Sequence, residues 1–471
     1  MRKFAIKIIF LLFPLILKAQ NSADIDLSFG DNFNNGSSIE AIAIQNDGKI
    51  IVGGTFAAFN GNVQNRLIRL NTDGTKDTSF NIGSGFPAQV YSIVIQPDSK
   101  ILVGGLFVTF NGVSQKYIVR LNNDGTRDTT FSNGSLFNGA SSSQSIKSIS
   151  LQQDGKILVG GNFSSNNIND LIRLNSNGTL DTTFNIGDGV GLTSGNAGVN
   201  SIAVQTDGKI IIGGIFNTFY SSLQYVNNLI RLNSDGSIDT SFNLYNSSTG
   251  FNNSIKTIKV QDDGKILVGG NFTTFNNISQ KNLIRLNSDG TKDTSFILQG
   301  LSFNNNVNTI AIQSDGKIIV GGNFTTYNGS LQPFLIRLLN DGTKDFSFDI
   351  NNGFNNGVLA TALQIDGKIL VGGAFSSYNS IQSNFLIRLK GENLLNLANF
   401  EKEKIVVYPN PATDILNIKD FKENETVTII NIYGQIIKTF VLKNDKIEIN
   451  DLKSGIYFLK INNSYLKFIK K

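Results

Sequence analysis

The chain of 471 residues contains no cysteine, no histidine and no tryptophan, and only one methionine. Without cysteine it has no disulfides, no thiolate nucleophile and no cysteine-ligated metal site. Without histidine, a Ser-His-Asp triad, an imidazole base and a histidine-held zinc or haem are excluded. The groups left for chemistry are carboxylates, lysine, tyrosine and hydroxyls, and the metals they suit are oxygen-ligated ions such as calcium.

A strong charge of one sign is also missing. The formal net charge is +5, and residues 1–20 contribute four basic residues and no acidic one. The rest of the chain carries 37 basic and 36 acidic residues. A near-neutral body lacks the electrostatic footprint that nucleic acid or an anionic membrane attracts, so we expect neither as a partner.

Residues 1–20 have a basic start, an apolar run over 8–17 and a small-residue exit at Ala19-Gln20. This pattern predicts a secretory signal peptide, because the apolar run is shorter than the roughly 20 residues of a membrane-spanning helix. A membrane anchor is the alternative. No later stretch is long and apolar enough to span, so we expect the mature chain to leave the cytoplasm without a transmembrane segment.

One unit of about 50 residues recurs seven times along the chain. Its first motif, Gln-x-Asp-Gly-Lys-Ile-x-Val-Gly-Gly-x-Phe, begins at Gln45, Gln96, Gln152, Gln205, Gln261, Gln313 and Gln364. A second motif, Leu-Ile-Arg-Leu-Asn-x-Asp-Gly-Thr-x-Asp-Thr-Ser-Phe, follows about 20 residues later and places arginines at 69, 120, 173, 231, 285, 337 and 388. A fixed period of this length is typical of repeat architectures.

Each unit is expected to form four short strands, which in the first unit are residues 41–44, 49–52, 67–70 and 77–80. Asp-Gly pairs separate the first strand from the second and the third from the fourth, and such pairs between strand patterns predict tight hairpins. Gly53-Gly54 ends the second strand and permits a bulge or a close approach of another backbone. Four strands in a unit of this length indicate a propeller blade.

The ends of the array predict how the ring closes. The seventh unit stops at Leu389 without the Asp-Thr-Ser-Phe segment, and the start of the mature chain carries the missing piece as Asp26-Leu-Ser-Phe29. We therefore predict an all-β fold, in which residues 24–389 form a seven-bladed β-propeller of four-stranded blades, closed by the N-terminal strand.

These motifs resemble the delta-60 repeat, a propeller-forming repeat of secreted and surface proteins in bacteria. The resemblance covers all seven units. The Gly-Gly pair is also similar to that of kelch blades, although the tryptophan and tyrosine of the kelch signature are missing. The resemblance implies a fold and no particular activity.

Residues 390–403 form a predicted linker, and the strand-like runs of residues 404–471 predict a small all-β domain, a β-sandwich. This segment resembles the type A sorting domain of the type IX secretion system of the Bacteroidetes. The residues that carry the resemblance are Tyr408, Pro409, Asn410, Pro411, Gly434, Gly455, Tyr457, Lys470 and Lys471. The resemblance implies passage through the periplasm and across the outer membrane, the secretion machinery as a partner, and a secreted or cell-surface protein.

The recurring charged residues allow more than one interpretation. The seven arginines form either a ring for an anionic ligand or, as we favour, pairs with nearby carboxylates such as Asp77. The pattern Asn71-x-Asp73-Gly74-x-x-Asp77 is faintly similar to a calcium loop, but turn chemistry explains it better, so we expect no cofactor. The lysines that follow the first turn, such as Lys49, are expected to be solvated charges at hairpin edges.

The loops that differ between units are predicted to share one face, because both tight hairpins of each blade must lie on the other. An aromatic residue recurs in these loops, and the candidate ligand-binding residues are Phe59, Phe110, Phe219, Phe275, Tyr327 and Tyr378. Such rings can stack on sugars or grip peptides. The alternative, which we favour, is that each ring packs beneath its own loop.

We expect no enzyme. The carboxylates placed on the variable face are Asp31, Glu40, Asp170 and Asp188, and their pattern nominates no catalytic pair. The predicted function is binding or adhesion by an exported propeller, through its variable loops, to an extracellular glycan or protein. The alternatives are a carbohydrate-active enzyme that uses these carboxylates and a purely structural surface protein.

Overall fold

A computed structural model describes residues 21–30, 33, 37–134, 136–137, 144–165, 168–192, 197–219, 224–244, 249–298, 300–391, 406–419, 426–431, 436–461 and 464–471. The predicted signal peptide and nearly all of the predicted linker lie outside these residues. The chain divides into two compact units, Met1–Asn393 and Leu394–Lys471. The described residues are all-β, and they include no helix that could cross a membrane.

The first unit of the repeat shows how each blade is built. Strands β1 (Ile39–Ile44), β2 (Ile50–Gly54) and β5 (Leu67–Leu70) form an antiparallel sheet in the order β1-β2-β5. The β1–β2 turn is tight because Gly48 adopts a φ of 81° and Asp47 accepts a hydrogen bond from the Lys49 amide at 3.1 Å.

The other six sheets repeat this order. They are β6 (Val90–Ile95), β7 (Ile101–Gly105) and β10 (Ile118–Leu121); β11 (Ser145–Leu151), β12 (Ile157–Ser165) and β13 (Ile168–Leu174); β15 (Gly198–Val204), β16 (Ile210–Ile215) and β19 (Leu229–Leu232); β20 (Ile255–Val260), β21 (Ile266–Gly270) and β24 (Leu283–Leu286); β25 (Val307–Ile312), β26 (Ile318–Gly322) and β29 (Leu335–Leu338); and β30 (Val358–Leu363), β31 (Ile369–Gly373) and β34 (Leu386–Leu389).

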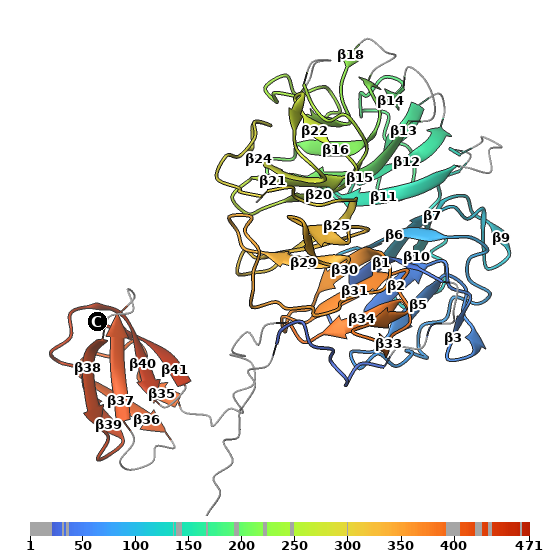
Figure 1. Cartoon of the computed structure of the whole chain (residues 1–471). Helices are drawn as coiled ribbons and strands as arrows, with labels where there is room; N and C mark the ends of the chain where they lie inside the picture. The colour runs from blue at the N-terminus through green and yellow to red at the C-terminus, as the bar shows by residue number, and fades with distance from the viewer. Residues whose placement is uncertain are drawn as a thin grey trace, which may run out of the picture. The chain divides into compact units, whose positions relative to one another are not determined.

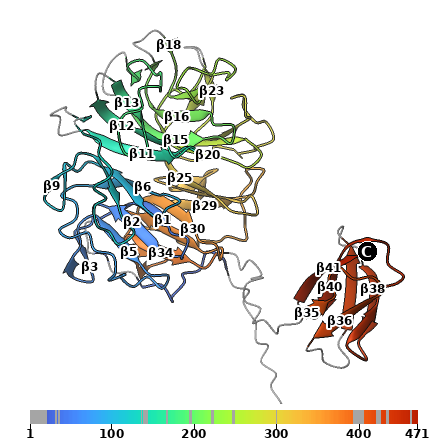
Figure 2. The same cartoon turned by 180° about the vertical axis from the view of Figure 1, so that it is seen from behind.

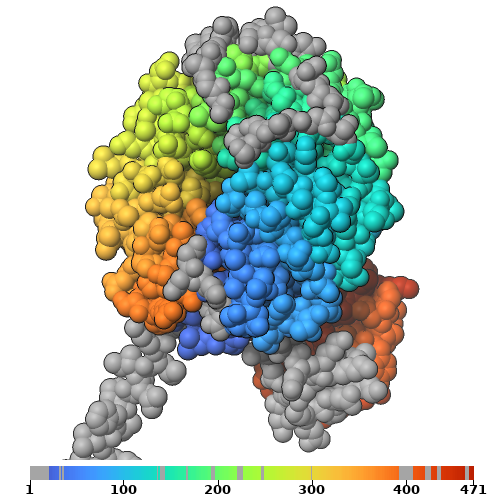
Figure 3. All heavy atoms as spheres, turned by 90° about the vertical axis from the view of Figure 1, so that its right-hand side faces the viewer, coloured from blue at the N-terminus to red at the C-terminus, as the bar shows by residue number. Residues whose placement is uncertain are grey.

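The seven sheets stand in a ring as propeller blades (Figure 1), as Figure 2 shows from behind. Each first strand contacts the first strand of the next blade, and β30 contacts β1, so these strands form the innermost circle. The cores lie between blades: one cluster joins Ile51 and Leu67 of the first blade to Val90, Ile101 and Phe107 of the second. In Figure 3 the blue atoms of the first blade lie beside the orange atoms of the last.

The Gly-Gly pair makes this packing possible. A Cβ added to Gly53 would lie 2.6 Å from Val90 Cγ1 of the next blade, and one added to Gly54 would lie 2.0 Å from the Ser38 carbonyl oxygen. At the ring's closing point, a Cβ on Gly372 would lie 2.6 Å from Ile39 Cγ2. The first glycine therefore makes room for the next blade and the second for the start of its own first strand.

The two faces of the ring differ. The turns after the first and third strands, residues 45–49 and 71–75 in the first blade, lie at one end of the sheet, which we call the turn face. The opposite end is the loop face. It carries short strands: β3 (Ala58–Phe59), β4 (Asn62–Val63), β8 (Thr109–Phe110), β9 (Val113–Ser114), β14 (Val190–Gly191), β17 (Thr218–Phe219), β18 (Gln224–Tyr225), β22 (Thr274–Phe275), β23 (Ile278–Ser279), β27 (Thr326–Tyr327), β28 (Ser330–Leu331), β32 (Ser377–Tyr378) and β33 (Ile381–Gln382).

The predicted fourth strand is wrong. A single bridge pairs Leu70 with Lys76, and residues 77–80 then form a turn in which the Phe80 amide donates to the Asp77 carbonyl at 3.3 Å. The strand ends because the Asp77 carboxylate accepts bonds from the Ser79 amide at 2.9 Å and hydroxyl at 2.7 Å, which bends the backbone. The blades are therefore three-stranded sheets with one extra bridge.

The N-terminal segment closes the ring, also as a bridge and a turn. Ile25 pairs with Leu389, the Asp26 amide donates to the Arg388 carbonyl at 2.8 Å, and the Lys390 amide donates to the Asp24 carbonyl at 2.8 Å. The start of the chain thus occupies in the seventh blade the place that residues 76–80 occupy in the first.

The second unit contains two antiparallel sheets. One has the order β35 (Val406–Tyr408), β36 (Ile415–Lys419), β39 (Lys446–Glu448), and the other has the order β38 (Ile436–Val441), β37 (Thr426–Asn431), β40 (Gly455–Ile461), β41 (Ser464–Lys470). Leu416 and Ile447 of the first sheet share a buried core with Ile429, Leu459 and Phe468 of the second.

Candidate functional site

A pair of arginine and aspartate recurs in every blade, and a lysine joins it in six of them. In the first, Arg69 Nε donates to Asp77 Oδ2 at 2.8 Å, Lys49 Nζ lies 3.0 Å from the same oxygen, and the Arg69 guanidinium lies 4.7 Å above the Phe80 ring. Burial alone would raise the pKa of the Asp77 carboxyl, but hydrogen bonds from Ser79, Lys49 and Arg69 hold this pKa well below its usual range.

The arginine also joins neighbouring blades. Arg69 Nη1 donates to the backbone carbonyl of Asn123 in the second blade at 2.5 Å, and Arg120 makes the same bond to Ser176 in the third. The arginine–aspartate distance is 2.6–2.8 Å in all seven blades, the pairs being 69–77, 120–128, 173–181, 231–239, 285–293, 337–345 and 388–26. These arginines hold the fold together, which was the favoured of the two predictions.

The lysines after the first turn are ion-paired, although the sequence predicted free charges. Six of them lie 2.8–3.2 Å from the aspartate of the cluster. The seventh, Lys317, lies 3.0 Å from Asp315.

The turn that is similar to a calcium loop uses its oxygens internally. Asp73 Oδ1 accepts hydrogen bonds from the Thr75 amide at 2.9 Å and hydroxyl at 2.6 Å, and Asp77 is bound by Arg69 and Lys49. Among the residues that the structure describes, no group of three acidic side chains is placed to hold a metal ion. The carboxylates of this pattern therefore serve the turn and the arginine–aspartate cluster.

The six aromatic residues predicted to bind ligand are buried, with exposed fractions of 1–4%: Phe59, Phe110, Phe219, Phe275, Tyr327 and Tyr378. Each belongs to a blade core. Phe59, for example, makes an edge contact with Phe33 at 5.1 Å between ring centroids, and Tyr378 Oη donates to the Ala23 carbonyl at 2.7 Å. A ring with both faces covered cannot stack on a ligand, so this assignment is corrected: the rings pack beneath their loops.

The structure describes three of the four carboxylates predicted for the variable face, Glu40, Asp170 and Asp188, and these three do not form a group placed to hold a metal ion. Asp31 lies outside the described residues, and the Asp188 carbonyl accepts a hydrogen bond from the Asn169 amide at 2.8 Å. Asp170 is 6% exposed and accepts a bond from the Phe163 amide at 2.7 Å. Burial raises the pKa of Asp170 to about 7, against the smaller effect of this bond.

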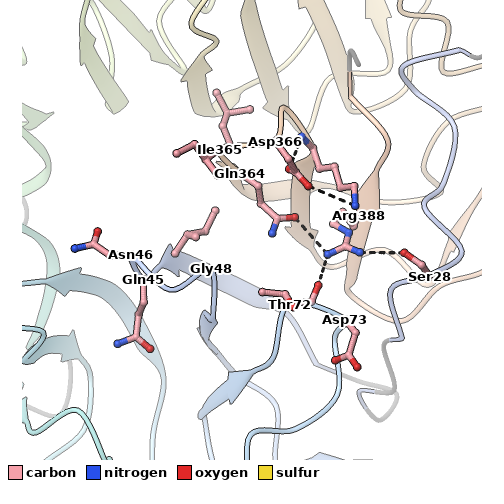
Figure 4. A pocket seen from close by; sticks show the side chains of 13 residues that line it. Ser28, Gln45, Asn46, Gly48, Thr72, Asp73, Gln364, Ile365, Asp366 and Arg388 are labelled. Carbon is pink, nitrogen blue, oxygen red and sulfur yellow. Dashed lines mark hydrogen bonds and ion pairs between the residues drawn. The ribbon is translucent and has the colours of Figure 1, made fainter. Parts of the chain in front are cut away.

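A cavity of about 750 Å³ opens on the turn face, where the seventh blade meets the first (Figure 4). Ile44, Leu363 and Ile365 give it apolar walls, and Ile365 is fully exposed. Arg388 lies in its wall, bonded to Ser28 at 3.2 Å and to the Thr72 carbonyl, as the dashed lines show. Arg388, Ser28 and Thr72 of this cavity thus already serve ring closure.

The innermost strands carry a distinct set of side chains at the loop-face end of the ring. Every innermost strand carries a β-bulge close to its start, which lies between Ile39 and Ala41 in the first blade. The extra residues are Glu40, Tyr91, Lys147, Asn200, Lys256, Asn308 and Leu359. All seven lie on the innermost circle of strands, towards its loop-face end, and each is half-buried or exposed.

These side chains interact electrostatically across the channel. Burial raises the pKa of Glu40, while the Ser38 hydroxyl, 2.7 Å away, and the charge of Lys147 oppose that rise. Burial and then the charge of Glu40 raise the pKa of Tyr91, and burial and then the charge of Lys147 lower that of Lys256. The bulge residues of blades one, two, three and five therefore influence one another electrostatically.

The sequence analysis missed this ring of residues except for Glu40. The signal was present, because aligning the seven units leaves Ile or Val at the preceding position and Ala, Ser or Thr at the next one. Between them, the bulge position holds acidic, aromatic, basic, amide and aliphatic side chains.

The landmarks of the C-terminal unit meet at the chain end. Asn410 Nδ2 donates to the Lys467 carbonyl and its Oδ1 accepts from the Ile469 amide, both at 3.0 Å, and the Lys471 amide donates to the Ala412 carbonyl at 2.9 Å. Tyr457 stacks on Phe468 at 5.7 Å, and Gly455 pairs with Lys470. The prolines 409 and 411, each after a cis peptide bond, and Tyr408 are exposed, and Gly434 lies outside the described residues.

A comparison with known protein families finds a match to the propeller. A family described as "Domain of unknown function (DUF5122) beta-propeller" matches residues 45–80, 96–131, 152–184, 205–242, 261–296, 313–348 and 364–391, more than half of the chain. The chain belongs to the DUF5122 β-propeller family. Each matched segment begins at the first turn of one blade, so the seven DUF5122 segments correspond to the seven blades of the ring.

A second family, described as "Secretion system C-terminal sorting domain", matches residues 406–471. The predicted type IX sorting domain is thereby confirmed. The DUF5122 propeller is exported across the outer membrane, to the cell surface or into the medium.

Individual relatives match distantly or in part. Beta-agarase D of Zobellia galactanivorans is 36% identical over 69 residues, 15% of this chain and 14% of the agarase. PorZ of Porphyromonas gingivalis, a surface component of the type IX secretion system, is 13% identical with a TM-score of 0.47, over 93% of this chain and 60% of PorZ. A gluconolactonase of Xanthomonas campestris is 10% identical with a TM-score of 0.38, over 77% and 97%. The chain spans less than two thirds of the agarase and of PorZ.

Proposed function

We propose that the propeller is a non-catalytic extracellular binding module, and that its ligand, a glycan or a protein, enters the central channel from the loop face. The observation that carries this proposal is the bulge ring defined by Glu40, Tyr91, Lys147, Asn200, Lys256, Asn308 and Leu359. Its side chains differ in chemistry from blade to blade, whereas the residues around it repeat.

Equivalent positions of the seven repeats can be compared with one another, and the comparison shows which positions keep the same residue. Positions that support the fold, such as the Gly-Gly pair and the arginine–aspartate cluster, carry the same residues in nearly every unit. A position freed from that constraint, on a rigid scaffold and facing solvent, is where recognition of a ligand is usually built. The bulge ring has these properties, and it lies on the innermost strands of the propeller.

The cavity on the turn face is a weaker candidate. Its arginine is bound to Asp26, Ser28 and Thr72, so a ligand that engaged Arg388 would compete with ring closure. The bulge ring, in contrast, includes side chains that the blades do not need for pairing.

Catalysis is not part of the proposal. Glu40 is the one carboxylate of the bulge ring, and a glycosidase needs two at a defined separation. We also propose that the two sheets of the C-terminal unit form a β-sandwich that acts as an export address and takes no part in ligand binding.

The test uses the mature chain, residues 21–471, on an array of extracellular polysaccharides and surface proteins. Tyr91→Ala in the bulge ring should weaken binding to any hit at least about tenfold, the effect of removing a central aromatic contact. Asn46→Ala, at an exposed turn on the opposite face, is the matched control and should bind like the parent. Equal binding by both variants, or a turnover that Glu40→Gln abolishes without changing the thermal melt, would refute the proposal.

A further inference from the structure

Three lysines open into the central channel without a counter-charge in contact. Lys147 and Lys256 belong to the bulge ring, and Lys259 lies three residues further along β20. All three side chains are exposed. Within the described part of the chain, none of the three ammonium groups makes an ion pair or hydrogen bond, whereas the seven lysines of the turn face are each paired at 2.8–3.2 Å.

The channel confines these charges. Burial lowers the pKa of Lys256 and of Lys259, although both side chains reach solvent. The first strands of neighbouring blades contact one another around the ring, so these side chains are accessible to water and still have protein close by. The charge of Lys147 also lowers the pKa of Lys256 from two blades away, so the two ammonium groups repel one another across the opening.

Confined, mutually repelling cations favour an anion between them, because a bound anion restores both the lost hydration and the missing counter-charge. Resting on the function proposed above, we propose that the channel binds a ligand carrying at least two oxyanion groups, one held by Lys147 and Lys256 at the loop-face end and the other by Lys259 deeper inside.

The spacing of the lysines favours a ligand whose charges repeat along a chain. Lys256 and Lys259 are about 10 Å apart along their strand, at about 3.3 Å per residue. The positions equivalent to Lys259 in the other blades hold shorter, uncharged residues, namely Ala43, Val94, Ser150, Ala203, Ala311 and Ala362. Oxyanions repeated along a chain, as sulfate, carboxylate or phosphate, match this spacing.

Glu40 gives a second prediction, which concerns the affinity for an anionic ligand. It is the acidic member of the bulge ring, and its charge interacts with Lys147. An anionic ligand near Lys147 is repelled by an ionised Glu40, so removing this carboxylate should strengthen binding. A merely structural role for the lysines predicts no such gain.

Isothermal titration of the mature chain with three anionic probes tests the proposal: sodium tripolyphosphate, a sulfated hexasaccharide and an oligogalacturonate, with maltohexaose as the neutral control. We expect at least one anionic probe to bind, and the one that binds identifies the source of the oxyanion. Lys147→Gln and Lys256→Gln should each weaken binding about tenfold, and Glu40→Gln should strengthen it. Lys76→Gln, the same change at an exposed bridge residue next to the turn face, should have no effect.

The results separate this inference from the proposed function. Absence of binding to every anionic probe, or an equal loss in Lys76→Gln, would overturn the anionic site. Binding of maltohexaose that Tyr91→Ala removes and Lys256→Gln leaves intact would also overturn it, while supporting the channel as a binding site. Thermal melts of all variants ensure that a loss reflects the site and not the fold.

Discussion

Arg388 Nε donates to Asp26 Oδ2 at 2.8 Å, although 362 positions separate the two residues. In the first blade the equivalent pair, Arg69 and Asp77, is eight positions apart. Lys368 adds a second cation 3.2 Å from Asp26, as Lys49 does for Asp77. The ring is therefore closed by the same cluster that stabilises each blade, assembled from the two ends of the repeat array.

Replacing Asp26 should weaken the whole ring. Asp26→Asn leaves Arg388 buried without its carboxylate, and breaking a buried pair in this way costs roughly 3–5 kcal/mol of unfolding free energy. Asp24→Asn is the matched control, because Asp24 is half-exposed and lies 3.9 Å from Lys390, so its loss should cost about 0–1 kcal/mol. Chemical denaturation measures both. Similar losses in the two variants would show that the Asp26 cluster does not hold the ring.

Acid should destabilise the propeller. The pKa of each cluster aspartate is lowered in the folded state, as for Asp77, Asp128 and Asp181, so the unfolded chain takes up protons first as the pH falls. The stability they contribute is complete above the unfolded pKa of about 4 and is lost as the pH falls below it. Melting temperatures recorded from pH 7 to pH 2.5 should fall steeply below pH 4. A flat profile throughout would contradict the shifts.

Asp170 should have the opposite effect. Its pKa rises to about 7 in the folded state, so the folded chain holds a proton that the unfolded chain has released, and stability falls as the pH rises from about 4 to 7. Asp170→Asn removes this loss, and the fourth blade already carries Asn228 at the equivalent place, where it accepts the Phe216 amide at 3.1 Å. The variant should be more stable than the parent at pH 8 by a few kcal/mol, at about 1.4 kcal/mol per pKa unit, and equal to it at pH 4. A constant difference between the two pH values would contradict this assignment.

The Gly-Gly pair offers a test of blade packing. Gly53→Ala places a methyl group 2.6 Å from Val90 of the next blade, and such overpacking costs about 1–3 kcal/mol. Gly30→Ala is the control, because no atom lies within 4 Å of its added Cβ. Thermal unfolding should separate the two variants, and an unchanged Gly53→Ala protein would mean that the blades can move apart freely.

Removing the sorting domain should change where the protein goes. A chain that ends before residue 404 keeps its propeller but lacks the segment that the sorting family matches. It should accumulate in the periplasm, whereas the full chain reaches the surface or the medium, as cell fractionation and immunoblotting would show. Equal export of both chains would contradict the assigned role.

Repetition and turn chemistry made much of the fold predictable. Asp47-Gly48 predicted the first turn, and Gly48 adopts the positive φ that this turn requires. The missing segment after Leu389 predicted that the N-terminus completes the seventh blade. These features could be inferred because they depend on neighbouring residues or on a comparison of one unit with the next.

Other features depend on contacts that no local pattern reveals. The bulge at Glu40 adds one residue to a strand of six, too short for a change in alternation to show. The burial of Phe59 depends on Phe33, which belongs to the segment before the first unit. The turn at Asp77 replaces a strand because its side chain bonds to Ser79, a choice that a β-rich sequence pattern does not disclose.

The ion pair between Asp26 and Arg388, which we call the clasp, also imposes an order on biogenesis. Synthesis and export deliver the chain from its N-terminus, so the first half of the clasp must wait until the seventh blade has followed it across the inner membrane. The sorting domain comes next in the chain. The sorting domain, which directs passage through the outer membrane, therefore emerges only after every residue needed to complete the ring. The order of the chain thus allows the ring to close before the export signal is complete.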